Sequence, residues 1–473
     1  MKTTSQEPNV PESGEVSKVN VAARRRVLTV CIIAALSGLI CGLDIGVVSG
    51  VLKPFGIEFH ASTITLEWIV GGMLIGAIIG AFTGGTLCQF VGRKYALIVS
   101  AAMFAIGAFG CASSSSIIEM FIFRVICGLG MGFSAFSAPA YLSEIASKES
   151  RGAMGSTYQL MLTIGIFLAF FSNSWLAPSG SWRSMLLVEA IPAACLAVVF
   201  FFLPHSPRDL LMRGLRDEAF KGLSLLRDNP ESVHEELDSI AENLQVKQDG
   251  WHLFKVNSNF RRSVALGMLL QLMQQFAGIN IVMYYAPRIL EVAKFSPSGQ
   301  MWGTAVIGLV NVLMTFVAVG YSDRWGRKPI LYTGYAIMAA SMASLAMILA
   351  HGPNSTVLQM SALAAVIFFV GGFSMSAGPL AWVICAEIQP TAGRNLGLSL
   401  STGTNMFCNL LIGTTFLSML EFFGSANTFW IFAAFNVFAI VMIYLFVPET
   451  KGVTLETIEK RLMSGVKLRN LGR

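Results

Sequence analysis

Three ionisable side chains stand inside long apolar segments of the chain, where a charge is costly. Asp44, Arg124 and Glu189 each lie in a different apolar segment. Such residues are rare, and each is a functional hypothesis by default. Asp44 could load and release a proton as a surrounding cavity opens to either side; a static ion pair with Arg124 is the alternative, and both could hold. Glu189 is a second buried acid, for which a structural hydrogen bond is the alternative.

Amide side chains form a second group that could bind a ligand. Gln274, Gln275 and Asn280 share one apolar segment, and each amide offers both a donor and an acceptor, which suits a neutral sugar. On an unbroken helix, Asn280 would point about 240° from Gln274 and about 140° from Gln275. The intervening Gly278 permits a break, after which both sides could face one cavity. Hydrogen bonding between helices is the alternative role for these amides.

The elements that carry these residues are predicted from the apolar runs. Of the 473 residues, 54% are hydrophobic and 13% are charged, against about 25% charged in a typical soluble domain. A membrane helix needs roughly 20 apolar residues, whereas barrel strands have about ten and alternate. The runs predict an all-α integral membrane protein of twelve helices. The predicted spans are 27–50, 66–89, 95–113, 117–141, 153–175, 184–203, 262–290, 301–321, 331–350, 358–386, 395–420 and 426–447.

The positions of lysine and arginine predict how the chain is oriented. If the N-terminus is cytoplasmic, nearly all of the 33 basic residues fall on the cytoplasmic side, and Arg124 falls inside a span. We therefore expect both termini in the cytoplasm. The net charge of +6 is then a signal of topology, and no nucleic-acid partner is expected. The basic residues left on the opposite side are Lys53, Arg183, Arg288 and Lys294.

The longest polar interruption, 204–261, divides the chain into two halves. We expect six-helix bundles over 27–203 and 262–447, a cytoplasmic helical linker between them, and cytoplasmic tails at 1–26 and 448–473. The halves repeat three motifs at a nearly constant offset, and duplicated bundles are what alternating access requires. The paired motifs are Gly92-Arg93-Lys94 with Gly326-Arg327-Lys328, Ser143-Glu144 before Arg151 with Ala386-Glu387 before Arg394, and Pro204-His205-Ser206 with Pro448-Glu449-Thr450.

The charged members of these motifs could form a cytoplasmic network that closes one face, since arginine pairs bidentately with carboxylates on neighbouring helix ends. Charge that only sets the topology is the alternative. The residues of the expected network are Arg93, Glu144, Arg151, Arg324, Glu387 and Arg394.

With these motifs the chain resembles the sugar porters of the major facilitator superfamily over nearly its whole length. Within that family it is most similar to the bacterial arabinose–proton and galactose–proton symporters, through 273–287 and 459–472. The resemblance rests on Gly92-Arg93-Lys94, Tyr141-Leu142-Ser143-Glu144, 274–280 (QQFAGIN), 323–328 (DRWGRK), Gly378-Pro379 with Trp382, and Pro448-Glu449-Thr450-Lys451.

The resemblance implies import of a monosaccharide with a proton across a bacterial inner membrane, by a functional monomer without a cofactor or metal. It implies that Asp44 carries the proton, that Arg124 tunes it, and that Glu189 assists. Tyr284 and Tyr285 would gate the outer mouth, with an aromatic belt as the alternative role; Pro379 would break the tenth helix into a mobile gate. Further sugar ligands implied in this way are Gln159, Asn311, Trp382, Asn405 and Asn409.

The chain departs from the family pattern at several places. Gln89 and Phe90 replace an Asp-Arg pair, which predicts a weaker cytoplasmic network in the first half. His205 replaces a glutamate, and Asp209 a tryptophan. Beside the expected site, Met406 replaces a tryptophan, and an aromatic residue before Asp44 is replaced by Cys41. The last two changes leave the identity of the sugar open.

Other functions are less well supported by the residues. A passive sugar facilitator is the close alternative, and a sugar sensor would normally need a longer signalling extension. No nucleotide-binding loop, metal-ligand spacing or nucleophile–base pair points to an enzyme, and the eight cysteines are expected to be buried thiols. The histidines fall in predicted loops or at span edges, at His60, His205, His234, His252 and His351.

Overall fold

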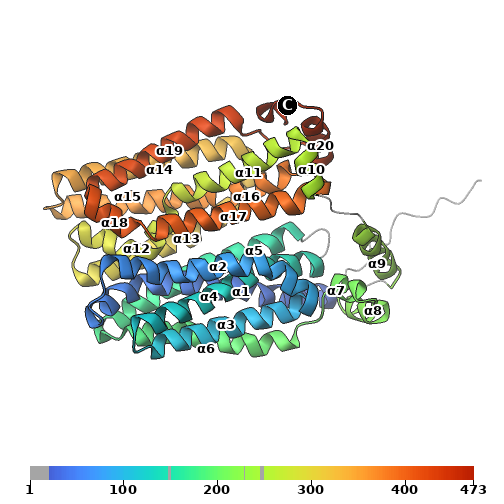
Figure 1. Ribbon diagram of the computed structural model, residues 1–473, viewed down its shortest axis with the longest axis horizontal. Helices are drawn as coiled ribbons and strands as arrows, with labels where there is room; N and C mark the ends of the chain where they lie inside the picture. The colour runs from blue at the N-terminus through green and yellow to red at the C-terminus, as the bar shows by residue number, and fades with distance from the viewer. Residues whose placement is uncertain (1–20, 147–150, 228–229, 246–249, 473) are drawn as a thin grey trace, which may run out of the picture.

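The computed structural model describes residues 21–146, 151–227, 230–245 and 250–472, and the regular elements in these ranges are all helical. Figure 1 shows two helical bundles lying side by side, with the short linker helices and α20 gathered at one end. We call this end the linker end and the opposite one the distal end. Eleven helices are long and apolar enough to cross a membrane, or twelve when one bent pair is counted as a single crossing. The predicted architecture of six plus six helices is confirmed.

The N-terminal bundle consists of six helices. Its first helix continues to Glu58, well past the predicted end at residue 50, with Lys53 and Pro54 inside it. The helices are α1 (Val21–Glu58), α2 (Thr63–Val91), α3 (Arg93–Ser113), α4 (Ile117–Ile145), α5 (Arg151–Leu176) and α6 (Trp182–Val199).

The C-terminal bundle also makes six crossings, but three of them are broken into two helices. The linker carries short helices, and one more helix follows the last crossing. The crossings are α11 (Ser258–Phe276) with α12 (Ile279–Val292), α13 (Pro297–Trp325), α14 (Arg327–His351), α15 (Thr356–Met375) with α16 (Ala377–Ile388), α17 (Arg394–Gly413) with α18 (Phe416–Phe423), and α19 (Ser425–Phe446). The short helices are α7 (Pro207–Met212), α8 (Arg216–Ser224), α9 (Pro230–Gln245), α10 (Gly250–Val256) and α20 (Leu455–Met463).

Serine caps begin five of the helices that start at the distal end, whereas α19 follows Gly424, which has no side chain to cap it. In each case the serine hydroxyl accepts a hydrogen bond from the backbone N–H three residues later, which satisfies one of the free donors of a helix start. At the linker end, Gly92 and Gly326 make the matching turns of the two halves with φ of 89° and 91°, values that favour glycine. The capping serines are Ser62, Ser116, Ser181, Ser296 and Ser355.

Glycines let the helices of the N-terminal bundle approach closely. A Cβ on Gly42 of α1 would lie 2.0 Å from the carbonyl oxygen of Leu162 on α5, and one on Gly128 of α4 would lie 1.9 Å from that of Met73 on α2. Small residues at such contacts stabilise membrane helix pairs by close packing. Such contacts hold α1 against α5 and α4 against α2.

Three breaks give the C-terminal bundle its shape. Gly278, with φ 101°, separates α11 from α12. Ser376, with φ −129° and ψ −88°, separates α15 from α16. The axes of α17 and α18 differ by 44°. Broken helices leave backbone groups free near the middle of a bundle, where they can bind a ligand or receive side-chain hydrogen bonds.

Candidate functional site

The N-terminal bundle encloses a buried ion pair. Arg124 Nη1 of α4 lies 2.5 Å from Asp44 Oδ1 of α1, with side-chain exposures of 1% and 0%. Arg124 Nη2 lies 3.1 Å from the Met73 sulfur of α2. The pair that the sequence offered as an alternative role for Asp44 therefore exists in this structure.

Glu189 of α6 completes a cluster of three charged groups. It is fully buried, and neither of its carboxyl oxygens, nor Asp44 Oδ2, has a hydrogen-bond partner within the described residues. One ligand atom each from Asp44, Cys127 and Glu189 lies within 4.8 Å of the others. The cluster holds two carboxyl groups and one guanidinium, so one proton on either carboxyl group balances its charge.

The same cluster has the ligand types of a metal site, but its arrangement suits a proton better. Arg124 already occupies one face of Asp44 at 2.5 Å, where a divalent cation would meet its positive charge. The absence of a metal site therefore stays a prediction. The positions of these residues in the sequence do not predict that Cys127 lies close to the two acids.

A chain of amide side chains crosses the C-terminal bundle. Asn280 Nδ2 donates to Gln275 Oε1 at 2.6 Å, across the break at the end of α11. Gln275 Nε2 donates to Asn405 Oδ1 of α17 at 3.1 Å. Asn405 Nδ2 in turn donates to Gln271 Oε1 at 2.6 Å and to Gln274 Oε1 at 2.7 Å. Side chains that an unbroken helix would point apart therefore form one connected group.

The second break in the bundle anchors this amide chain. Gln274 Nε2 donates to the carbonyl oxygens of Ala377 and Gly378 in the first turn of α16, at 3.0 Å each. Pro379 lacks an N–H and removes a helical donor at this point, which accounts for the break just before it. Trp382 lies on the same helix with 37% of its surface exposed, and it makes no hydrogen bond with the amide chain among the described residues.

The remaining expected ligands lie at separate places around this group. Gln159 of α5 and Asn311 of α13 line a small cavity of about 60 Å³ between the two halves, and Asn311 Oδ1 accepts a hydrogen bond from Ser374 at 2.7 Å. Asn409 Nδ2 donates to the Tyr284 hydroxyl at 3.3 Å. The cavity is too small for a monosaccharide, so the halves must move apart here for one to bind.

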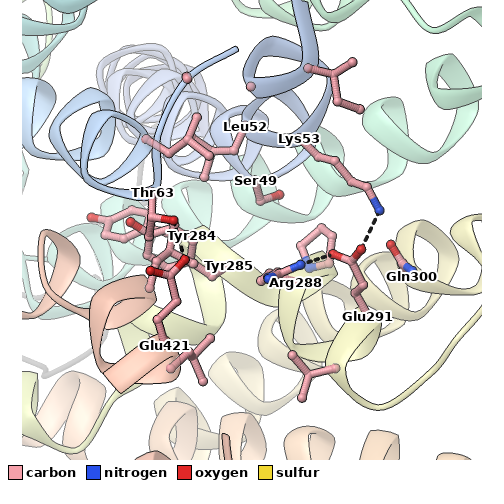
Figure 2. A pocket seen from close by; sticks show the side chains of 18 of the residues that line it. Ser49, Leu52, Lys53, Thr63, Tyr284, Tyr285, Arg288, Glu291, Gln300 and Glu421 are labelled. Carbon is pink, nitrogen blue, oxygen red and sulfur yellow. Dashed lines mark hydrogen bonds and ion pairs between the residues drawn. The ribbon is translucent and has the colours of Figure 1, made fainter. Parts of the chain in front are cut away.

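The two halves meet in a gate at the distal end. Figure 2 shows the pocket there, of about 460 Å³, which is lined by both halves and includes Tyr284 and Tyr285. Lys53 of α1 forms an ion pair of 2.8 Å with Glu291 of α12, across the halves. Thr63 of α2 donates to the carboxylate of Glu421 on α18. We call these two contacts, Lys53–Glu291 and Thr63–Glu421, the distal gate.

A third contact between the halves lies beside the distal gate. Glu67 of α2 is 2% exposed and accepts hydrogen bonds from the backbone N–H and the hydroxyl of Ser418 on α18, at 2.7 Å each. These contacts, Lys53–Glu291, Thr63–Glu421 and Glu67–Ser418, join the two halves at the distal end. Glu67 was not predicted as a functional residue, although it lies inside a predicted span, as Asp44 does.

The other end holds a cavity and no such gate in the described residues. A hollow of about 430 Å³ lies between α2 and α4 on one side and α17 on the other, from Asn395 to Met406. Phe82 and Phe136 line it opposite Met406. The structure is thus closed at the distal end and hollow toward the linker end.

In the N-terminal half, Arg93 is the centre of the expected charge network. Its side chain pairs with Asp209 of α7 and, at 3.2 Å, with Glu144 of α4. Its backbone N–H donates to Asp209 Oδ2 at 2.6 Å, and the Ser206 hydroxyl donates to Glu144.

The C-terminal half repeats this arrangement with its own residues. Arg327 pairs with Glu387 at 3.2 Å, and the Thr450 hydroxyl donates to Glu387 at 2.5 Å. Glu449 accepts the backbone N–H groups of Arg327 and Lys328 at 3.0 and 2.9 Å. In both halves a carboxylate packs directly on the turn glycine, so that each network fixes its own helix turn.

Among the described residues the expected network does not join the two halves, and its closing of the linker end stays a prediction. The pairs described above join residues of the same half, because each acid lies on a helix beside its own arginine. Arg394 forms no ion pair with a described carboxylate. The side chains of Arg151 and Arg324 lie outside the described part of the structure.

Asp209 supplies the carboxylate at the Gly92 turn of the first half. By the repeat, His205 corresponds to Glu449, but burial and the charges of Lys94 and Arg213 lower the pKa of His205, so its ring is neutral near pH 7. Asp209, one turn into the linker, takes the place of the missing carboxylate on Arg93. Gln89 and Phe90 are exposed and take no part in this contact.

The comparisons agree with this geometry. The family model described as "Sugar (and other) transporter" matches residues 30–462. The galactose-proton symporter of Escherichia coli (strain K12) is 49% identical over 444 residues, which cover 94% of this chain and 96% of that protein. The arabinose-proton symporter of the same strain is 46% identical over 453 residues, with 95% and 96% covered.

Solved structures extend the likeness to three dimensions. The inward open conformation of the xylose transporter XylE from E. coli matches with a TM-score of 0.79 at 28% identity, covering 92% of this chain and 100% of that one. Its partially occluded inward open conformation matches with a TM-score of 0.77 at 27% identity, covering 89% and 100%.

The first prediction concerns the distal gate. Lys53→Glu replaces an ion pair by two acids, which should favour opening of the distal end by roughly 1 kcal/mol, or about fivefold. A cysteine introduced at Ser49, which lines the pocket, should then react about fivefold faster with a membrane-impermeant maleimide.

Two variants control this measurement. The double swap Lys53→Glu with Glu291→Lys should return the labelling rate to that of the parent. Arg183→Glu breaks a distal pair with Glu58 that lies within one half, and it should leave the rate unchanged. Equal labelling of the Lys53→Glu variant and the parent would show that the pair does not hold the gate.

The second prediction concerns Asp209. Asp209→Asn removes a buried carboxylate from Arg93, while Glu144 remains, so we expect a loss of about 3 kcal/mol in stability. The melting temperature in detergent should fall by several degrees, and adding His205→Glu should recover part of the loss. Asp217→Asn, at an exposed acid of α8, is the matched control. A shift no larger than that of this control would refute the role of Asp209.

Proposed function

The chain belongs to the sugar transporter family, the sugar porters of the major facilitator superfamily, and from this premise we propose that it imports a monosaccharide together with a proton. It is a multi-pass membrane protein, and alternating access between two bundles is the expected mechanism. The observation that carries the proton part of the proposal is the cluster of Asp44, Arg124 and Glu189.

The proton has a defined place in this proposal. A charge at the bilayer centre is costly unless it is balanced, and the cluster has two acids for one guanidinium. The cluster therefore changes its net charge by one when a proton binds. Asp44 is the proposed carrier because it matches the coupling carboxylate of similar symporters, and a proton on Asp44 would exchange with its ion pair to Arg124. Glu189 supplies the second carboxylate that makes the charge of the cluster depend on the proton.

The sugar is proposed to bind at the amide chain and the cavity beside it. Gln274, Gln275, Asn280 and Asn405 already satisfy one another, so sugar hydroxyl groups would replace these bonds without leaving buried donors unpaired. Trp382 is proposed to offer an aromatic face. The other proposed ligands are Gln159, Asn311 and Asn409.

Movement of the two halves would expose this site to one side and then to the other. The distal gate and Glu67–Ser418 are the contacts that must break for the distal side to open. Tyr284 and Tyr285 line the pocket behind the gate, and the Tyr285 hydroxyl is held by the carbonyl oxygen of Gly413 at 2.7 Å. The breaks at Gly278 and Pro379 are the proposed hinges.

We further propose that the linker end faces the cytoplasm of a bacterial cell, that both termini lie there, and that one chain suffices for transport. The basic residues of the linker support this orientation. The named relatives act on galactose and arabinose, which favours a hexose or pentose. Met406 and the buried Cys41, whose sulfur accepts a bond from the Tyr158 hydroxyl at 3.7 Å, are the nearby residues that could adjust the choice.

The third prediction tests symport. Galactose or arabinose added to de-energised, weakly buffered vesicles should make the medium more alkaline, because each sugar carries a proton inward. The pH electrode records this directly, and L-glucose serves as the non-substrate control. Real sugar uptake without a pH change would instead identify a passive facilitator.

The same assay separates sugar ligands from amides that only join helices. Gln275→Ala should raise the half-saturating sugar concentration at least tenfold, through loss of about 1.4 kcal/mol or more. Asn173 donates to the carbonyl oxygens of Gly46 and Val47 at 3.2 Å, and Asn173→Ala should lower the melting temperature with little change in that concentration. Similar sugar dependence in both variants would count against the amide site.

A further inference from the structure

A groove at the linker end of the C-terminal bundle is separate from the transport site. It has a volume of about 850 Å³ and lies between the start of α11, the end of α19 and the segment after α20. Its lining combines apolar side chains, among them Leu269 and Phe446, with the basic residues Arg262, Lys467 and Arg469. A groove with one apolar part and one cationic part suits an amphiphilic anion.

Arg262 and Arg469 contact neutral groups in the described part of the structure. Arg262 donates to Asn259 Oδ1 at 3.1 Å and to the carbonyl oxygen of Val466 at 3.4 Å. The Arg469 guanidinium lies over the Tyr444 ring, 4.4 Å from its centroid. Within the described residues, none of the three forms an ion pair with a carboxylate. Their positive charge is therefore available to a ligand.

The fold fixes the cations in place. Leu462 and Leu471 are fully buried and form a small core with Ile458. Arg461 Nη1 donates to the carbonyl oxygen of Leu471 at 2.9 Å, and Gly465, with φ 83°, turns the chain back toward α11. Lys467 and Arg469 are thus carried by a packed segment.

The groove also lies at the boundary of the membrane. The candidate spans Ser258–Val292 and Ser425–Phe446 begin and end beside it. Leu445 and Phe446, at the end of α19, are 45% and 42% exposed. From residue 460 onward the chain has five basic residues and no acid, and basic clusters directly beyond a membrane helix attract anionic lipids.

We propose that this groove binds an anionic phospholipid from the leaflet at the linker end. Arg262, Lys467 and Arg469 hold its phosphate group, and its acyl chains lie along Leu269 and Phe446. The lipid joins the segment after α20 to α11, the helix that carries Gln271, Gln274 and Gln275. This proposal rests on the groove and its charges, and it holds whichever sugar is transported.

The experiment measures melting of the full-length protein in neutral detergent with short-chain phosphatidylglycerol, short-chain phosphatidylcholine or inorganic phosphate. Phosphatidylglycerol should raise the melting temperature several degrees above the value in phosphatidylcholine. Lys467→Gln with Arg469→Gln should remove most of this difference. Lys221→Gln with Lys255→Gln removes the same charge from exposed positions outside the groove and the basic C-terminal segment, and this pair should retain it.

Further variants keep the test decisive if the double variant does not fold. Lys467→Gln alone should reduce the difference, and Arg469→Lys, which keeps the charge, should preserve most of it. An equal effect of phosphatidylcholine, or an equal loss in both double variants, would overturn the proposal. The same rise with inorganic phosphate would assign the groove to free phosphate and would also overturn it.

Discussion

The ion pair between Asp44 and Arg124 is the interaction on which the N-terminal half depends. Burying charges costs several kcal/mol per ion unless they are paired with good geometry, and this pair lies 2.5 Å apart with almost no exposure. The glycine contacts at Gly42 and Gly128 hold the two helices that carry the pair, α1 and α4, close to their neighbours α5 and α2. Glu189 leaves the cluster one proton short of neutrality.

The C-terminal half solves a different problem with neutral groups. Its amides and freed carbonyls form one hydrogen-bonded chain, which needs no charge and can exchange its partners for sugar hydroxyl groups. The breaks at Gly278 and Ser376 make this possible, because they bring residues of four helices together. The duplicated halves thus share a fold and a turn motif but place the proposed proton and sugar sites in separate bundles.

Much of this arrangement follows from the sequence. The length of the apolar runs predicts the membrane crossings. The free-energy cost of a charge inside the membrane indicates Asp44 as a candidate functional residue. The helical positions of Gln275 and Asn280, with Gly278 between them, predict the break that joins these two side chains. Contacts between distant segments do not follow, because spacing within a helix says nothing about the partner helix: Lys53 meets Glu291 across 238 positions. The contact of Asp209 with Arg93 was not predicted, because Asp209 replaces a carboxylate from a different position of the motif. The pairing of Arg327, and not Arg394, with Glu387 likewise depends on helix packing.

Sugar accumulation by an Asp44→Asn variant is the most direct test of the proposed coupling. With asparagine at position 44, the cluster keeps one carboxylate, Glu189, and one guanidinium, Arg124. Their charges already balance, so the cluster no longer needs a proton to be neutral. The variant should exchange sugar across energised vesicles but fail to accumulate it, while Glu58→Gln, at an exposed acid on the same helix, should accumulate it normally. Undiminished accumulation by Asp44→Asn would contradict the account.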